Sequence, residues 1–508
     1  MSDQSIRIIQ KWLKRCEIGH PSCRVLTTRG PQDGRQNILA VLPTRVIRVG
    51  SADEKKVNLY ETFGQFGRHT ALSHRWLPGK TPKWVTTKKN ADKRQKGFSI
   101  RELPKSIRDA IQVTRKLGLK YLWIDSLCIL QDSTEDWDIE SSRMVDMYSH
   151  AHVTLFADGA RDDDAGFLGP RKFADHKPLA VRLKVQHGGA VTLPVFIRIS
   201  VDGSRQDFKS TVDESVLSSR GWILQERLMS RRILHFGKEQ ICWECRTMVD
   251  QEDGLVLPDE REWLRGIHNE LLGHNETTDT KNWRRIAEVY SQCQLTKHCD
   301  KLPALSGIAS AVSAVRKGDI YLAGLWKNSL ALDLAWKTEW TKSMAPTEYR
   351  APSWSWASID GRIEYWDTPR WKRLENLAVA FDVTEARVEY QGKNLFGHVR
   401  DGSLTLSGLL VEVSCLGPYS EWLTPLYVGG TPVGSAYFDL GAFFYSRTVT
   451  CFKLLDTGTL WDEVFLVLIP FRGHFRRIGL GDTCLGAGSR YLSQSIFAKS
   501  TKQTITIL

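Results

Sequence analysis

Cysteine and histidine side chains near the start of the sequence have the spacing of metal ligands. Three residues separate Cys16 from His20, and two separate His20 from Cys23. Thiolate sulfur and imidazole nitrogen are ligands that zinc prefers, and a closed structural site needs four of them. Cys299 or His298 is a candidate for a distant fourth ligand. Because no second pair with matching spacing accompanies the first three residues, we assign no metal site from the sequence, and zinc binding by these residues stays an open alternative.

A second pair of cysteines, Cys242 and Cys245, lies in the segment ILHFGKEQICWEC, which has the pattern of a strand. Side chains three residues apart on a strand point to opposite faces of a sheet. We therefore predict that this pair packs rather than binds metal. Cys128 is close to Asp125 in the sequence, but its motif holds no histidine, and buried thiols are usually inert.

Trp222 and Glu226 are four residues apart in a segment expected to be helical, so they share one face of the helix. Beside a bound glycoside, a carboxylate can stabilise a transition state that resembles an oxocarbenium ion, but the spacing alone does not show that a glycoside binds here. The alternative is that Glu226 pairs with Arg220, Arg227 or Arg231 and fixes the helix, because carboxylates near arginines are usually structural. Trp222 alone is more often a core residue than part of a binding surface.

Asp125 directly follows the apolar run at residues 121–124. Ligands of open α/β sheets bind at the carboxyl ends of the strands, so Asp125 could orient a ribose hydroxyl. Equally, it could cap the next turn through the backbone amides of Ser126 or Cys128. The same strand-end argument applies with less force to Ser73 and Trp76, and the Trp76 indole could stack on an aromatic base.

Strand and helix patterns alternate between residues 70 and 157, which is typical of a parallel sheet covered by helices. Pro104 suits the first turn of a helix, and Ser133 with Asp136 resembles a capping arrangement. The elements expected are, in order, a strand at 70–76, a solvated basic loop at 80–96, a helix at 104–118, a strand at 121–124, a helix from 133 to 148 and a strand at 153–157.

The rest of the chain changes pattern several times. Alternating segments at 181–185 and 191–199 predict a β insertion, and residues 259–315 predict a helical middle. We expect β-structure again at 383–390, 404–413 and 464–469, and core packing between the domains for the SWSW motif at 353–356, placed on a strand. The domains expected are a lead-in at 1–69, an α/β domain at 70–236 with an insertion at 166–218, a helical region at 237–317 and a β-rich domain at 318–508.

Composition limits the class of protein. The 508 residues carry 70 Lys and Arg against 58 Asp and Glu, a net charge of +12 that is spread along the chain and does not by itself predict nucleic-acid binding. We find no secretory leader and no apolar run long enough to cross a membrane, and the irregularly spaced cysteines suit a reducing compartment. The sequence therefore predicts a soluble, cytoplasmic protein without a membrane partner.

Four blocks of sequence closely resemble the fungal heterokaryon-incompatibility (HET) domain family. They are ALSHRW at 71–76, YLWIDSLCILQDSTEDWDIESSRMVDMYSHA at 121–151, SRGWILQERLMSRRILHF at 219–236 and APSWSWASIDG at 351–361. The opening WLKRCEIGHPSC at 12–23 also resembles the usual start of such proteins. His74 and Arg75 stand where many relatives carry Tyr and Cys. The resemblance implies a role in fungal non-self recognition that triggers programmed cell death.

The HET family in turn resembles TIR domains, whose flavodoxin-like sheet can cleave nicotinamide from NAD. That resemblance implies a flavodoxin/TIR-like sheet here, with NAD as a substrate rather than a bound cofactor. It implies Glu226 as the catalytic carboxylate, because in TIR-type enzymes that carboxylate follows a tryptophan on a helix beside the sheet. The substrate-binding residues expected are Ser73, Trp76, Asp125, Trp222 and Gln225.

The alternative function is a signalling module without catalysis. In that case the HET fold associates with itself or with a partner protein, and the C-terminal region supplies recognition or restraint. The surroundings of Glu226 discriminate between the two hypotheses. A carboxyl that faces a pocket with Asp125 and Trp76 favours the enzyme, whereas a carboxyl locked in an arginine network favours the adaptor.

Overall fold

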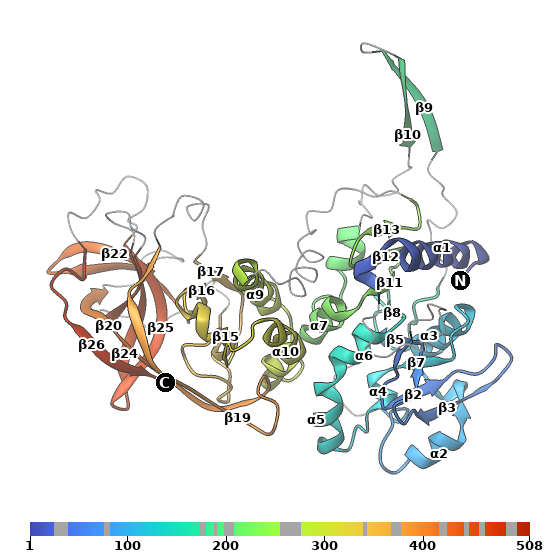
Figure 1. Ribbon diagram of the computed structural model, residues 1–508, viewed down its shortest axis with the longest axis horizontal. Helices are drawn as coiled ribbons and strands as arrows, with labels where there is room; N and C mark the ends of the chain where they lie inside the picture. The colour runs from blue at the N-terminus through green and yellow to red at the C-terminus, as the bar shows by residue number, and fades with distance from the viewer. Residues whose placement is uncertain are drawn as a thin grey trace. The chain divides into compact units, whose positions relative to one another are not determined.

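Four parallel strands form the centre of the main sheet in the computed structural model (Figure 1). Each is a short and almost wholly buried segment, as expected for strands that are covered on both faces. They are β5 (His69–Ser73), β7 (Tyr121–Trp123), β8 (Val153–Phe156) and β11 (Arg232–Phe236). The spatial order is β7-β5-β8-β11, which is 2-1-3-4 in chain order. The chain therefore crosses β5 between β7 and β8, and the strand order reverses there.

Antiparallel strands extend the sheet at both edges, so the sheet is mixed. The sequence predicts a parallel sheet. The physical reason for the difference is local at two places, because short hairpins connect β2 with β3 and connect β11 with β12 and β13. Beyond β7 lie β2 (Arg45–Arg48), β3 (Lys56–Glu61) and β6 (Phe98–Ser99), and beyond β11 lie β12 (Ile241–Cys245) and β13 (Val249–Gln251). Two short strands, β1 (Ala40–Val41) and β4 (Phe66–Gly67), pair separately.

Helices cover both faces of the sheet. On one face Thr70 Oγ1 of β5 lies 2.7 Å from Thr114 Oγ1 of α3 (Lys105–Lys116). On the other face Thr154 Oγ1 of β8 lies 2.7 Å from Ser230 Oγ, the residue that ends α7 (Gly221–Met229). Helix α6 (Met144–His150) packs beside α7, while α1 (Asp3–Gly19) lies on the α3 face, where Trp12 stacks on Trp243. The result is a three-layer α/β/α arrangement.

The structure confirms the expected helix after Pro104 and the strands β5, β7 and β8. It corrects the helix expected from 133 to 148, which is two helices, α5 (Thr134–Ser142) and α6, that meet at Arg143. The Ser142 hydroxyl donates to the Ile139 carbonyl at 2.7 Å, and such side-chain bonds compete with helical ones. The basic stretch expected to be a loop contains α2 (Ala91–Lys96), and α4 (Asp125–Cys128) follows β7.

The predicted β insertion is a separate antiparallel pair, β9 (Leu179–Gln186) and β10 (Ala190–Ile197).

Contacts between residues divide the chain into two compact units, Met1–Gly273 and His274–Leu508. The structure describes residues 1–24, 39–75, 82–169, 171, 179–186, 190–197, 208–254, 276–338, 343–366, 377–415, 424–440, 447–456, 463–483 and 495–508. Among these residues, none of the helices combines the length and hydrophobicity needed to cross a bilayer.

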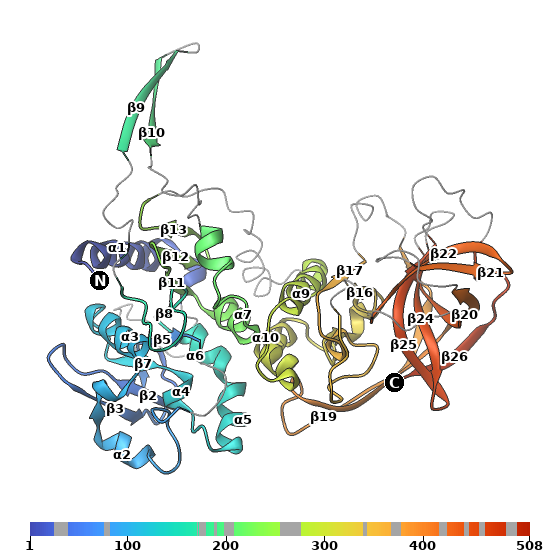
Figure 2. The ribbon, with the colours of Figure 1, turned by 180° about the vertical axis from the view of Figure 1, so that it is seen from behind.

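The second unit combines a helical part with an antiparallel β part (Figure 2). Its helices are α9 (Glu276–Ser291), α10 (Ser306–Val315) and α11 (Leu330–Asp333), beside the short strands β14 (Tyr321–Leu322), β15 (Leu325–Trp326), β16 (Trp336–Thr338) and β17 (Ile363–Tyr365). The strands of the β part are β18 (Ala378–Val379), β19 (Phe381–Tyr390), β20 (Val399–Cys415), β21 (Thr424–Val428), β22 (Thr431–Phe438), β23 (Arg447–Asp456), β24 (Glu463–Phe471), β25 (His474–Asp482) and β26 (Lys502–Ile507). Pairing runs from β20 through β23, β24, β25, β22 and β21 and returns to β20.

The SWSW motif is not a strand, contrary to the sequence prediction. It forms a turn that leads into a 3-10 helix at Trp356–Ser358, because the Ser355 hydroxyl accepts a hydrogen bond from the Ala357 amide at 3.0 Å. Both tryptophans are nevertheless fully buried, within the second unit. The Trp356 indole donates to the Gly324 carbonyl at 3.0 Å, and the Trp354 carbonyl accepts from the Trp336 indole at 3.1 Å.

A network of buried charges holds α7 against the sheet. The Arg227 guanidinium donates to Glu244 of β12 at 2.7 Å and to Asp213 at 2.6 Å. His235 of β11 lies between Asp158 at 2.9 Å and Glu244 at 3.0 Å. Burial lowers the pKa of His235, but the charges of these two carboxylates outweigh burial and raise it. Both ring nitrogens of His235 thus face carboxylate oxygens, and the imidazole links Asp158 to the Arg227 network through Glu244.

We predict that Arg227→Met lowers the free energy of unfolding by about 3–5 kcal/mol, because it leaves Glu244 and Asp213 buried without their shared cation. Urea denaturation followed by circular dichroism measures this loss. The exposed Arg101 supplies the matched control, and Arg101→Met should change stability by less than about 0.5 kcal/mol. Equal effects of the two substitutions would show that the network does not hold α7.

Candidate functional site

Contacts at both ends of α7 place Glu226 beside the carboxyl end of β5. At the start of the helix, the Arg220 guanidinium donates to the carbonyl of His74, the residue that follows β5, at 3.1 Å. At its end, Ser230 contacts Thr154 in the middle of β8. Glu226 lies between these two anchor points and is only 6% exposed. The helix thus carries a carboxyl into the edge of the sheet where the parallel strands end.

Burial dominates the chemistry of the Glu226 carboxyl. It raises the pKa of Glu226 to about 8, the Ser73 and Tyr148 hydroxyls near the carboxyl offset part of the rise, and the negative charge of Asp125 adds to it. Oxygen Oε2 is buried and has no hydrogen-bond partner among the described residues. At neutral pH the free protein therefore holds Glu226 mostly in its protonated form.

The arginines that could have neutralised Glu226 are engaged elsewhere. Arg227 binds Glu244 and Asp213, and Arg231 donates to the backbone carbonyls of Ser149, His150 and Ala151. The Arg220 charge lowers the pKa of Glu226, but only as a minor contribution. Across the described part of the chain, no ion pair joins Glu226 to an arginine.

A second buried carboxyl, Asp163, follows β8 at the same edge of the sheet. Burial raises the pKa of Asp163 to about 7, and the charges of Asp125, Asp164 and Asp162 add to the rise. His74 Nε2 lies 3.4 Å from Asp163 Oδ1, while burial lowers the pKa of His74 to about 3. The imidazole is therefore neutral at physiological pH and does not hold Asp163 in its ionised form.

Asp125 is half-buried at the end of β7, and its carboxylate accepts the Ser126 amide at 2.7 Å. The structure thus shows the capping role that the sequence allowed for this residue. The acceptor atom in this contact is Asp125 Oδ1. The charge of Asp125 also acts on both Glu226 and Asp163, so the three carboxyl groups form one electrostatic cluster.

Three of the other predicted site residues, Ser73, Trp222 and Gln225, lie within the described part of the chain, and the fourth, Trp76, does not. Ser73 and Gln225 are fully buried, and Trp222 is half-buried against Trp137 of α5, with ring centroids 6.1 Å apart. The structure therefore brings Ser73, Asp125 and Glu226 together and places Trp222 and Gln225 on the same helix as Glu226.

Two carboxyl groups with raised pKa values lie near the carboxyl ends of β5 and β8, next to the position where the strand order reverses, and the charge of Asp125 acts on both. Ligands of open α/β sheets bind at this position, and perturbed pKa values concentrate at functional sites. Such a cluster can exchange protons near neutral pH. It can also favour a cationic ligand, because a nearby positive charge stabilises the ionised carboxylates.

Residues 69–226 match the family model described as Heterokaryon incompatibility protein (HET). The chain carries a HET domain. The match begins in β5 and ends at Glu226, so the HET domain contains the whole carboxyl cluster. No curated protein and no solved structure matches the chain.

Sequence analysis missed Tyr148 and Asp163 within the HET domain. Asp163 belongs to an acidic run that follows the strand β8, so the strand-end rule applied to Asp125 could have found it. Tyr148 lies in a helix with an apolar stripe and gave no separate signal. Its ring packs against Trp123 of β7, with centroids 5.5 Å apart, and this contact directs the phenol toward Glu226.

The residues with metal-ligand spacing lie apart from the HET-domain cluster. Cys16, His20 and Cys23 meet Cys245, on the side of the sheet that α1 covers. The fourth member is therefore Cys245, and not the Cys299 or His298 considered from the sequence. The structure confirms that Cys242 and Cys245 face opposite ways, because Cys242 packs with Phe208 and Val212 on the α7 side.

The raised pKa of Glu226 predicts a pH-dependent stability. Between about pH 4.5 and about pH 8 the unfolded chain has lost the proton that the folded chain keeps, so the stability of the folded state falls across this window. Glu226→Gln removes that loss. We expect the unfolding temperature of the variant, relative to wild type, to rise from about pH 5 to about pH 8 and then to stay level.

Calorimetry in matched buffers measures this difference. Glu135 is exposed on α5, and Glu135→Gln serves as the control whose difference from wild type should not vary across the same window. A constant difference between Glu226→Gln and wild type would mean that the folded protein does not raise the pKa of Glu226.

Proposed function

We propose that this protein acts in fungal non-self recognition and triggers programmed cell death by cleaving NAD in its HET domain. The HET-domain match indicates a role in heterokaryon incompatibility. The observation that carries the catalytic part is Glu226, a buried carboxyl without an ion pair among the described residues, at the carboxyl ends of the parallel strands. The 2-1-3-4 order of these strands supports a flavodoxin/TIR-like fold, since flavodoxin-like sheets begin with this order.

The proposed reaction is hydrolysis of an N-glycosidic bond. The bond between the ribose C1′ atom and the nicotinamide nitrogen breaks, and its electron pair leaves with the nitrogen, which becomes neutral. Water then adds to C1′ and releases a proton, so the products are nicotinamide and ADP-ribose. A carboxylate beside C1′ stabilises the positive charge that develops on the ribose in the transition state.

Substrate binding would supply the ionised form of Glu226 that this reaction needs. The nicotinamide ring of NAD is a cation, and a cation beside a buried carboxyl lowers its pKa. Glu226 is protonated in the free protein at neutral pH, so binding of the cationic ring and release of the Glu226 proton would be coupled. A neutral or anionic ligand would not gain from this coupling, which makes the cluster selective for positive charge.

The remaining predicted residues receive roles from the TIR resemblance and from the chemistry of their side chains. Asp125 is half-buried at the end of β7, and we assign its carboxylate to a ribose hydroxyl of the substrate. We assign Trp76 to stacking on an aromatic base and Trp222 to the wall of the nicotinamide side. Ser73 and Gln225 then help to position the substrate around Glu226.

The alternative is a cytoplasmic signalling module that works by self-association or by binding a partner protein, without catalysis. The specific observation that favours it is the 6% exposure of Glu226, since a substrate reaches this carboxyl only after neighbouring side chains move. In this case the carboxyl cluster would control the stability of the HET domain rather than a reaction. Both functions fit a role in heterokaryon incompatibility.

We predict that purified wild-type protein releases nicotinamide from NAD when it is concentrated enough to self-associate. Glu226→Gln and Glu226→Ala should lower kcat by about 100-fold or more, because they remove the charge that stabilises the transition state. Liquid chromatography of nicotinamide and ADP-ribose measures the rate. In the wild type, kcat/KM should rise with pH through about 8, the pKa of Glu226 in the free protein.

Glu140 provides the matched control for this assay. Glu140 is also a buried glutamate of the same unit, and burial raises its pKa, but it lies on α5 at 3.9 Å from Arg45 of β2. Glu140→Gln should keep the wild-type rate. Absence of nicotinamide release at every protein concentration, with cell killing retained by Glu226→Gln, would reject the enzyme and support the signalling module.

A further inference from the structure

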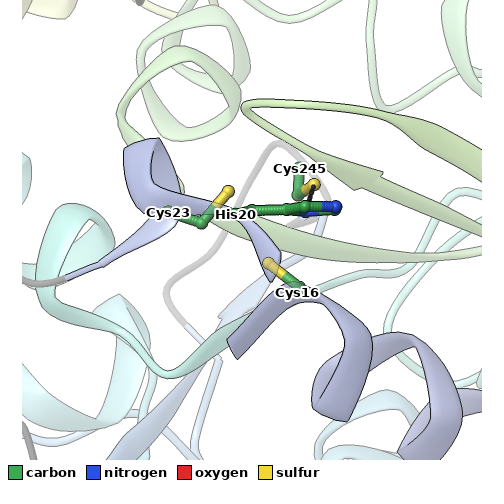
Figure 3. Close-up of side chains that lie close together, drawn as sticks. All are labelled: Cys16, His20, Cys23 and Cys245. Carbon is green, nitrogen blue, oxygen red and sulfur yellow. Dashed lines mark hydrogen bonds between the residues drawn. The ribbon is translucent and has the colours of Figure 1, made fainter. Parts of the chain in front are cut away.

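Four potential metal ligands converge at the end of α1. Cys16, His20, Cys23 and Cys245 are all buried, and one ligand atom of each lies within 4.8 Å of the others (Figure 3). Cys245 Sγ lies 3.4 Å from His20 Nδ1. The close-up shows the side chains pointing toward one another from α1, the segment after it and β12. Three sulfurs and one imidazole nitrogen form the ligand set of a Cys3His site.

Local structure explains why the three N-terminal residues meet. Cys16 lies in the last turn of α1, and His20 caps the helix by donating its backbone amide to the Cys16 carbonyl at 3.2 Å. Pro21 then starts a single 3-10 turn that ends at Cys23. The chain changes direction between the α-helix and the 3-10 turn, so the side chains of Cys16, His20 and Cys23 come together.

Strand β12 delivers the fourth side chain. Cys245 is its last residue and pairs with Arg232 of β11, on the face of the sheet against which α1 packs. Trp243, two residues earlier and on the same face, stacks on Trp12 of α1, with ring centroids 6.2 Å apart. The packing of α1 on β12 thus brings together ligands that are more than two hundred residues apart in sequence.

The distances match tetrahedral zinc. With Zn–S bonds of about 2.3 Å and Zn–N bonds of about 2.0–2.1 Å, tetrahedral geometry places two sulfurs about 3.8 Å apart and a sulfur and a nitrogen about 3.5 Å apart. The sulfur-nitrogen distance of 3.4 Å between Cys245 and His20 agrees with these values, and the ligand atoms of the whole set lie within 4.8 Å of one another. Sulfur-rich tetrahedral sites select zinc over oxygen-preferring metals such as magnesium or calcium.

Charge around the cluster provides independent support. Arg231 and Arg232 are buried, and within the described ranges neither forms an ion pair with a carboxylate. Arg232 Nε donates to Cys16 Sγ at 3.2 Å, and both guanidinium groups donate to the Cys23 carbonyl. A zinc ion with three thiolates and one neutral imidazole carries a net charge of −1. Such a site would supply the negative charge that these buried cations otherwise lack.

We propose that Cys16, His20, Cys23 and Cys245 bind one structural zinc ion. All four positions of the tetrahedron are filled by the protein, so the ion has no open position for a substrate. It fastens α1 and the following turn to β12. The site lies on the α1 face of the sheet, whereas Glu226 lies on the α7 face, so the two sites can be tested separately.

Metal analysis of the full-length protein tests the proposal directly. The protein is purified with a non-chelating reductant, incubated with zinc sulfate and freed of unbound metal by gel filtration. Inductively coupled plasma mass spectrometry should find about one zinc per chain in the wild type. Cys245→Ser and His20→Ala should each lose most of this zinc, whereas His20→Cys, which restores four ligands, should retain it.

Two controls separate metal loss from unfolding. Cys299→Ser changes an exposed cysteine outside the cluster and should keep the full zinc content. A strong chelator should lower the unfolding temperature of the wild type by about 5 °C or more and leave that of Cys245→Ser unchanged, because binding free energy contributes to folding. Cobalt in place of zinc should give the visible absorption bands of a tetrahedral, thiolate-bound ion.

Three results would overturn the proposal. The first is a wild-type protein without bound zinc after incubation with zinc sulfate under reducing conditions. The second is unchanged zinc content in both Cys245→Ser and His20→Ala. The third is iron rather than zinc as the bound metal, since it would assign the cluster to a different centre.

Discussion

Glu226 and Arg227 are neighbours on α7, both are buried, and Arg227 alone is surrounded by opposite charges. Asp213 and Glu244 bind Arg227 from a preceding turn and from β12, and this fixes the rotation of α7 on the sheet. That rotation directs Glu226 toward Ser73 and the carboxyl end of β5. Removing a buried charge from its partners is strongly unfavourable, so the helix has little freedom to turn. The ion pairs of Arg227 with Asp213 and Glu244 thereby keep the protonated Glu226 carboxyl at the edge of the sheet where ligands of open α/β sheets bind.

The two faces of the sheet in the first unit have different tasks. The α6 and α7 face carries Glu226, whose pKa burial raises to about 8. The α1 face carries the thiol cluster, whose ligands close around a single point and leave no place for a substrate. Strand β12 serves both faces, because Glu244 binds Arg227 on one side and Cys245 approaches Cys16 on the other. Because successive side chains of β12 point to opposite faces of the sheet, Glu244 holds α7 on one face and Cys245 approaches the end of α1 on the other.

Sequence patterns predicted the features that depend on neighbouring residues. The strands β5, β7 and β8 are short apolar runs, and Asp125 follows one of them directly, so both could be found from local order. Contacts between distant segments could not be found in this way, because spacing in the chain carries no information on which strand a helix covers. The partners of Arg227 and the fourth member of the cysteine cluster are of this kind. At SWSW, a side-chain cap at Ser355 overrode the alternation that predicted a strand.

Infrared difference spectroscopy of the Glu226 carboxyl tests the central claim most directly. Spectra of wild type minus Glu226→Gln, recorded from about pH 3 to about pH 10, isolate the C=O band of the protonated side chain. We predict that this band is present at neutral pH and disappears with a midpoint at about pH 8. A midpoint near the ordinary glutamate value of 4.5, or no band at all, would show that Glu226 is solvated or paired in the folded protein. Either result would contradict the account given for α7 and its carboxyl.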